Sequence, residues 1–164
     1  MMKQQLITQA TELAESLHLE PPEFSEEGLG MLRFPEGIEL NLQYLAADES
    51  CLLFVILGQL PERNRENIIE YAMTSNLFWR RTSGATLAYE KEYASMVLQD
   101  RLPLLELEPH ILRETVEGML ETAELWTAIV KKSNEVAEEG NQNEAAKPLD
   151  AAQLMQQFDP RQFA

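Results

Sequence analysis

Residues 38–44 read Ile-Glu-Leu-Asn-Leu-Gln-Tyr, and apolar and polar side chains alternate at every position of this stretch. Because successive side chains of a β-strand point to opposite faces, such alternation predicts a strand with one buried face and one face in water. An apolar segment at residues 29–34 precedes it, and a continuous apolar run at residues 51–57 follows it. Turn residues at 35–37 and 46–50 separate the segments, so the sequence predicts consecutive antiparallel strands, the last of them covered on both faces.

More elements follow on either side of this unit. Residues 85–90 and 94–99 read as two strands joined by a short turn. Apolar residues recur at helical spacings in residues 6–17, 62–79 and 109–136, and the last of these patterns is the strongest. The element order is α-β-β-β-α-β-β-α, and we expect an α+β fold in which helices pack against a twisted antiparallel sheet.

The predicted helix at residues 62–79 carries apolar residues on two sides, one of which includes Ile68 and Ala72. A helix on the outside of a small two-layer domain needs only one apolar stripe. The second side therefore indicates contact with another chain. We predict a homodimer whose interface includes Ile69, Met73, Asn76 and Leu77.

The composition changes after Lys132, where a polar stretch rich in Glu, Asn and Gln begins. We therefore predict a folded domain over residues 1–132 and an acidic, flexible tail over residues 133–164. Leu154 and Phe158 have the i, i+4 spacing of a short amphipathic turn, but the composition favours a disordered tail.

The charge of the chain excludes several classes of function. Its 164 residues include 13 Lys and Arg against 28 Asp and Glu, a formal charge of −15. Binding to nucleic acid or to an anionic membrane needs a basic surface, so both are disfavoured. The longest apolar run, residues 51–57, is far shorter than the roughly 20 residues of a membrane helix, and no membrane insertion is expected. A single cysteine, Cys51, and the lack of a signal-peptide core predict a reducing cytoplasm.

The sequence offers no cluster of residues suited to catalysis. Cys51 opens the most apolar strand, where a cysteine is usually a small inert hydrophobe. His18 comes at the end of the first helix, where a cation complements the helix dipole. His110 and Glu114 share a helix face, but surface carboxylates are common throughout so acidic a chain. We therefore predict a binding protein and not an enzyme, with no catalytic, cofactor-binding or metal site.

Four short stretches in the second half of the chain resemble one known family. They are residues 75–79 (SNLFW), 82–87 (TSGATL), 101–104 (RLPL) and 123–126 (AELW). Their order, the small size, the acidity and the predicted element order are together similar to the class I chaperones of bacterial type III secretion, the Tir-chaperone family. The resemblance extends over about residues 6–130, and the tail after Lys132 departs from the short family core.

The resemblance implies a cytoplasmic bacterial homodimer without ATPase activity or cofactor. It implies that the protein binds an N-terminal, non-globular segment of one or more secreted effectors, keeps it soluble and secretion-competent, and aids its delivery to the export apparatus, whose ATPase is a further candidate partner. It also places the helix at residues 62–79 at the two-fold interface, where its two apolar sides independently place it. The alternative function is a regulator on the same scaffold that sequesters a transcriptional activator or anti-activator of the secretion system.

An effector segment that is still unfolded presents apolar side chains and unpaired backbone groups. An exposed sheet edge pairs with such a backbone by strand addition, and apolar pockets beside the edge take alternate side chains. The first helix and the first strand are the natural walls of this groove. The residues that we predict for it are Leu13, Leu17, Leu29, Met31 and Leu32. Ordinary core packing is the alternative for each of them, and Phe34 fits the core better.

Overall fold

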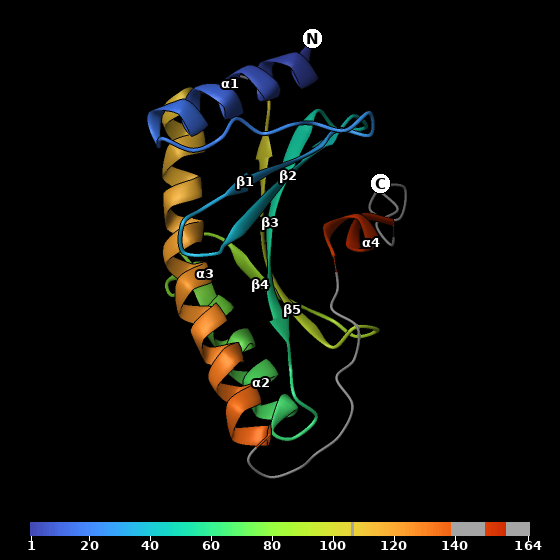
Figure 1. Ribbon diagram of the computed structural model, residues 1–164, viewed down its shortest axis with the longest axis vertical. Coiled ribbons are helices and arrows are strands. Elements are labelled where there is room, and N and C mark those ends of the chain that lie inside the picture. Colours follow the sequence, from blue (N-terminus) through green and yellow to red (C-terminus); the bar gives the residue numbers. More distant parts are fainter. Residues whose placement is uncertain (106, 139–149, 157–164) are drawn as a thin grey trace.

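The computed structural model describes residues 1–105, 107–138 and 150–156, and it has the predicted α+β architecture (Figure 1). The helices are α1 (Met2–Ser16), α2 (Arg65–Asn76), α3 (Pro109–Glu138) and α4 (Ala151–Gln156), with the short 3-10 helix η1 (Leu77–Trp79) directly after α2. The strands are β1 (Leu29–Arg33), β2 (Glu39–Leu45), β3 (Ser50–Gln59), β4 (Thr86–Glu90) and β5 (Ser95–Pro103). The predicted order of elements from α1 to α3 is confirmed.

The strands form one antiparallel sheet in the order β1-β2-β3-β5-β4. β3 lies in the middle, which agrees with its continuous apolar run. The register of β3 against β5 shifts between Ile56 and Gly58. Gly58 has a φ of +123°, and a Cβ at this position would lie 3.1 Å from Val130 of α3. Glycine therefore suits both the irregular backbone and the close approach of the helix at this point.

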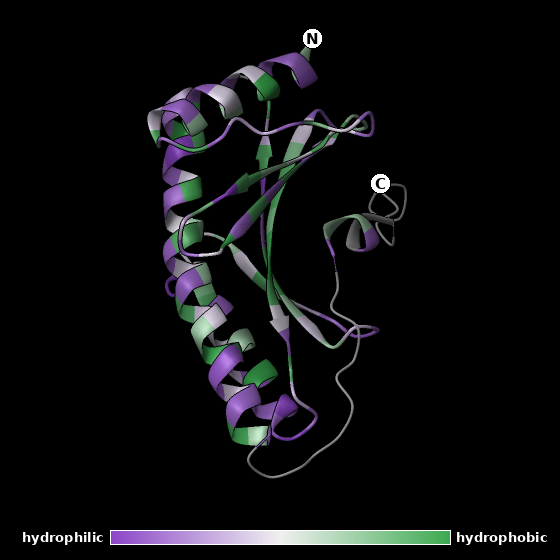
Figure 2. Cartoon of the chain, viewed as in Figure 1, coloured by the Kyte–Doolittle hydropathy of each residue, from purple (hydrophilic) through white to green (hydrophobic). Residues whose placement is uncertain are grey.

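Helices α1 and α3 cover one face of the sheet and enclose the core with it (Figure 1). α3 buries the side chains that its spacing predicted, which are Leu112, Val116, Met119, Ala123, Trp126 and Val130. Figure 2 shows the resulting alternation of hydrophobic and hydrophilic residues along this helix. The sheet contributes alternate residues of β3 to the same core, namely Cys51, Leu53, Val55 and Leu57.

The other face of the sheet, the open face, is formed by the remaining set of alternate side chains. Its apolar members include Leu29 of β1, Leu52, Phe54 and Ile56 of β3, and Val97 of β5. Helix α4 lies on this side, opposite α3 (Figure 1). Its residue Ala151 packs with Phe54 and Val97 in a small cluster separate from the main core.

Two polar residues of β2 on the open face differ from the prediction of a face in water. Asn41 is only 2% exposed and Gln43 is buried as well. The Asn41 amide donates to the Phe54 carbonyl at 3.3 Å, and the Gln43 amide donates to the carbonyls of Glu27 and Tyr44, each at 2.9 Å. These hydrogen bonds take the place of water, so the prediction is wrong at these positions.

The second helix ends earlier than its sequence pattern indicated. α2 stops at Asn76, and Phe78 and Trp79 adopt left-handed backbone with φ of +56° and +52°. The Asn76 carboxamide donates to the Leu87 carbonyl at 2.9 Å and accepts from the Leu87 amide at 2.8 Å. This pair of bonds fixes the end of α2 against the outer edge of β4. The predicted continuous helix to Trp79 is therefore wrong over its last turn.

Helix α3 continues past the predicted domain boundary at residue 132, to Glu138. The Asn134 side chain donates to the Gln59 carbonyl at 2.8 Å, which ties this part of the helix to the end of β3. α4 falls within the predicted tail, so for these residues the structure differs from the disordered tail that the composition favoured. Residues 139–149 and 157–164 of the tail lie outside the described residues, and its flexibility stays a prediction.

Candidate functional site

Strand β1 is an edge strand whose outer side has no neighbouring strand. The Tyr44 amide of β2 donates to the Gly28 carbonyl at 2.9 Å, directly before β1. Because hydrogen bonding alternates along an antiparallel ladder, the even-numbered residues of β1 pair with β2. The odd-numbered residues Leu29, Met31 and Arg33 therefore turn their N–H and C=O groups toward the outside.

Only the beginning of this edge is occupied. The Ser25 amide donates to the Leu29 carbonyl at 2.8 Å, and the Ser25 hydroxyl accepts from the Leu29 amide at 3.3 Å. Within the described part of the chain, the outward backbone groups of Met31 and Arg33 have no hydrogen-bond partner. The opposite edge, on β4, is occupied at Leu87 by the side chain of Asn76. The β1 edge at residues 31–33 is thus open to pairing with a strand from another chain.

The structure divides the predicted groove residues between the two faces of the sheet. Leu13 and Leu32 are buried in the core beneath α1 and α3, which is the alternative that the sequence left open. Leu17 is half-buried against the same core. Leu29 and Met31 are half-buried, and their alternation with Leu32 places them on the open face. Leu29 and Met31 therefore lie beside the free edge, where a paired strand would bring its own side chains.

An apolar patch extends from Leu29 across the open face. Phe54 and Val97 at its centre are 1% and 3% exposed with α4 in place. Asn41 lies opposite Phe54 in the register of β2 and β3, and its side-chain oxygen is buried without a hydrogen-bond partner. The open face thus combines apolar side chains with one unsatisfied acceptor, and an unsatisfied buried acceptor of this kind is uncommon in a finished core.

A second apolar surface lies at the end of α2. This α2 surface consists of Met73, Leu77, Phe78 and Trp79, which are 69%, 61%, 71% and 54% exposed. Soluble monomers rarely expose large adjoining apolar side chains, and such a surface is typical of a protein interface. Phe78 was missed as a member in the sequence, because a continuous helix would place it on a flank.

The predicted interface residues separate into two groups. Met73 and Leu77 belong to the α2 surface. Ile69 is half-buried against the core, and Asn76 uses its side chain on the backbone of Leu87. Tyr71, on the neighbouring side of α2, stacks on the buried Trp126 of α3 with ring centroids 5.4 Å apart. The apolar sides of α2 are thus used differently, one toward α3 and one toward solvent.

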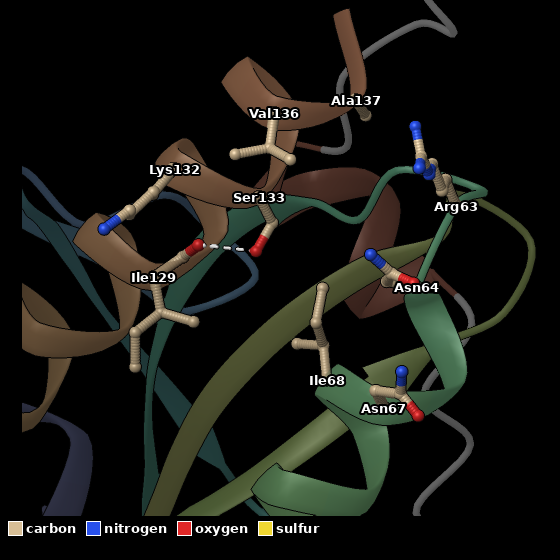
Figure 3. Close-up of a pocket in the computed structure, with 9 residues that line it drawn as sticks. All are labelled: Arg63, Asn64, Asn67, Ile68, Ile129, Lys132, Ser133, Val136 and Ala137. Atoms are coloured by element: carbon tan, nitrogen blue, oxygen red, sulfur yellow. Dashed lines mark hydrogen bonds between the residues drawn. The ribbon is translucent and has the colours of Figure 1, made fainter. Parts of the chain in front are cut away.

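A pocket of about 390 Å³ lies between the start of α2 and the end of α3 (Figure 3). Ile68, Ile129 and Val136 give it an apolar lining, and Arg63 and Lys132 add positive charge. Its lining residues include no carboxylate, thiol or imidazole. The pocket is therefore a small amphipathic cavity with a basic rim, away from the free edge of β1.

The burial of Cys51 and the placement of the His, Cys, Asp and Glu side chains bear on catalysis and metal binding. Cys51 is fully buried, and burial raises the pKa of its thiol to about 12, so it stays protonated and unreactive. Among the described residues, no three His, Cys, Asp or Glu side chains come together as a metal site. The described ranges also include no helix whose length and apolarity would let it span a bilayer.

Comparison with protein families shows where this chain belongs. The family model described as the Tir chaperone protein (CesT) family matches residues 8–127. The matched part runs from α1 into α3 and includes every strand of the sheet. Comparison with curated protein sequences gives no match.

Several solved structures have a similar fold. A chain of the ExsC–ExsE complex superposes with a TM-score of 0.64 at 21% identity, over 78% of this chain and 95% of that chain. A chain of the HopA1–SchA chaperone–effector complex gives 0.59 at 20% identity, over 74% and 91%. A chain of the heterodimeric ExoU–SpcU complex from the type III secretion system of Pseudomonas aeruginosa gives 0.60 at 17% identity, over 74% and 98%. At these identities the likeness establishes a shared fold.

Proposed function

The chain belongs to the Tir chaperone protein (CesT) family, and from this premise we propose that it is a type III secretion chaperone for one or more effectors. It binds an N-terminal segment of the effector in a non-globular form, keeps that segment soluble and aids its delivery to the export apparatus. The observation that carries this proposal is the free edge of β1 at Met31 and Arg33 beside an apolar sheet face. Backbone pairing holds an extended segment whatever its sequence, and the apolar side chains select among segments.

The working unit is a homodimer joined through the α2 surface. Met73, Leu77 and Phe78 are all more than half exposed in the single chain, so pairing removes apolar area from water. A stable interface buries roughly 1,600 Å² in total, which requires the neighbouring parts of α2 and η1 as well. Twice the charge of −15 gives the pair a formal −30, which limits further association and attracts a basic client or docking site.

The protein acts in the bacterial cytoplasm and has no enzymatic activity. A client must be bound before export, while it is still unfolded, which places the chaperone on the cytoplasmic side. The buried, protonated thiol of Cys51 supports the absence of covalent chemistry. Delivery brings the loaded chaperone to the export apparatus, with its ATPase as the docking partner.

Co-purification from the native bacterium tests the function. A tagged chain, isolated and analysed by mass spectrometry, is expected to carry a secreted protein whose N-terminal fragment resists protease while bound. Recovery of a transcriptional activator or anti-activator in place of a secreted protein would replace the chaperone function with a regulatory one. Recovery of the chain alone, with no partner under secreting conditions, would contradict both functions.

The substitution Met31→Pro tests the role of the free edge. Proline removes the outward N–H of residue 31 but takes no hydrogen bond from the ladder with β2. We expect the affinity for the co-purified client to fall by about tenfold, the effect of one or two lost backbone hydrogen bonds. Met31→Ala is the matched control, since it removes the side chain and keeps the N–H.

Calorimetry with both variants, each first checked for an unchanged melting temperature, separates backbone pairing from side-chain contact. If Met31→Pro binds the client as the unmodified protein does, the client does not add a strand to β1. If Met31→Ala loses as much affinity as Met31→Pro, the side chain carries the contact and not the edge.

A further inference from the structure

Helix α4 covers the centre of the open face. Its residue Ala151 is 9% exposed and packs on Phe54 and Val97, with Leu29, Leu52 and Ile56 around them. α4 lies outside residues 8–127, the part that the family model matches. Figure 1 shows it on the side of the sheet away from α1 and α3. The cover therefore lies beyond the part of the chain that the family model describes.

The start of α4 is encoded locally. The Gln153 amide donates to the Asp150 carboxylate at 2.8 Å, and the Asp150 amide donates to the Gln153 side-chain oxygen at 3.3 Å. This reciprocal pair is a capping box, which satisfies donors at the beginning of a helix. In the sequence, apolar residues follow Ala151 at positions 154, 155 and 158, the spacing of one helix face. Residues 150–158 thus have the pattern of a short amphipathic helix.

Another segment can bind the part of the open face that α4 covers. A helix of this length is unstable by itself in water, so its helical form depends on the contact with the sheet. Among the described side chains of α4, the small Ala151 makes this contact, and the buried oxygen of Asn41 on the same face of the sheet has no donor. α4 already leaves Phe54 and Val97 only 1% and 3% exposed, so what a competing segment can add is a free N–H that satisfies that oxygen.

We propose that α4 is the resting occupant of the open face, and that an amphipathic apolar helix of the client displaces it. This inference rests on the proposed chaperone function, because it takes the displacing segment from the client. α4 belongs to the same chain as the sheet, which keeps its local concentration high and the apolar patch covered between clients. Only a segment that binds the patch better than the tethered helix displaces it, so the cover also acts as a filter for clients.

The test uses the full chain and needs no client. Val97→Cys places a thiol under α4, and its rate of reaction with a small thiol reagent reports how often the cover is open. The native Cys51, buried on the opposite face, serves as the internal reference for opening of the core. Mass spectrometry of peptides reads the two thiols separately.

Two further substitutions in the Val97→Cys chain form a matched pair. Ala151→Glu places a charge between α4 and the sheet, whereas Ala152→Glu places the same charge on the exposed side of the same helix. We expect Ala151→Glu to raise the labelling rate of the thiol at position 97 by about tenfold or more through local opening, with Cys51 unchanged. Ala152→Glu should leave both rates unchanged. Equal rates in the unsubstituted, Ala151→Glu and Ala152→Glu chains would overturn the proposal, as would equal acceleration by both substitutions.

A synthetic peptide with the sequence of residues 148–160 is the probe for a displacing segment. Added in excess to the Ala151→Glu chain, it should slow labelling at position 97 again, whereas the same peptide with its own Ala151→Glu change should not. A peptide without effect would overturn the exchange of occupants on the open face. Both results are independent of the co-purification and of Met31→Pro, so failure of the cover and failure of the chaperone function are distinguishable.

Discussion

The α2 surface and the open face are both apolar and both lie outside the main core, but only the open face is covered by a helix of the chain. Leu77 and Phe78 of the α2 surface are more than half exposed, with only the Arg80 guanidinium among the described residues recorded over the Phe78 ring, 5.9 Å from its centroid. Phe54 and Val97 of the open face are almost fully buried beneath α4. An apolar surface that the chain leaves exposed needs a permanent partner. A surface covered by a helix of the same chain suits a partner that binds transiently.

The two surfaces also differ in how firmly the backbone that forms or covers them is held. The α2 surface is held in place because Asn76 bonds both backbone groups of Leu87, and the left-handed residues Phe78 and Trp79 follow directly. The open face receives its cover from α4, a helix of six residues. Rigid presentation fits a permanent dimer, and a tethered helix fits exchange. The predictions below test this contrast, in order of expected effect.

The largest effect is expected from Leu77→Glu. In a symmetric dimer both copies carry the new charge, and burying it unpaired should weaken self-association by about 4 kcal/mol or more. Light scattering after size-exclusion chromatography is expected to report a monomer at micromolar concentration. The matched control is Asn67→Glu, which adds the same charge to α2, directly before η1, on the side that lines the pocket with α3. A dimer that survives Leu77→Glu would place the interface elsewhere.

A smaller and opposite pair of effects is expected for two phenylalanines. Phe54→Ala should lower the free energy of unfolding by about 3 kcal/mol, because a ring that is 1% exposed leaves a cavity. Phe78→Ala should change the stability of the single chain by less than about 0.5 kcal/mol, because its ring is exposed, but it should weaken the dimer. Urea denaturation at low protein concentration, together with ultracentrifugation, separates the two. Similar losses of stability in both variants would remove the contrast between the surfaces.

The smallest effect is expected from Asp100→Asn on β5, which supplies a baseline for pH dependence away from both apolar surfaces. Burial raises the pKa of Asp100, and the nearby Arg101 amide lowers it by less. A carboxyl whose pKa is higher in the folded state binds more protons there, so stability falls as pH rises from the ordinary aspartate pKa of about 3.9 through the raised value. The melting temperature of Asp100→Asn should therefore exceed that of the unmodified chain at pH 7. The two should converge near pH 3, and an equal difference at both pH values would contradict this origin.

Much of the fold could be predicted because its signals are local. The alternation at residues 38–44, the apolar run at 51–57 and the helical steps from Leu112 to Val130 each identify an element and the side chains that need burial. The candidate site was predicted less well. Leu29 and Met31 lie by the free edge, but Leu13 and Leu32 are core, because the pattern of a half-buried helix or strand is the same whether its partner is the core or a client.

The sequence by itself determined the element order, the acidity and which side of α3 faces the sheet, since these depend on composition and on spacing within one turn or one strand. Only the tertiary structure decided where α2 stops, which part of the β1 edge stays open and what covers the open face. Each of those depends on a contact between residues of different segments: Asn76 with Leu87, Ser25 with Leu29 across a turn, and Ala151 with Phe54. A periodic pattern states that a side chain must leave water, but only the folded chain supplies the partner that removes it.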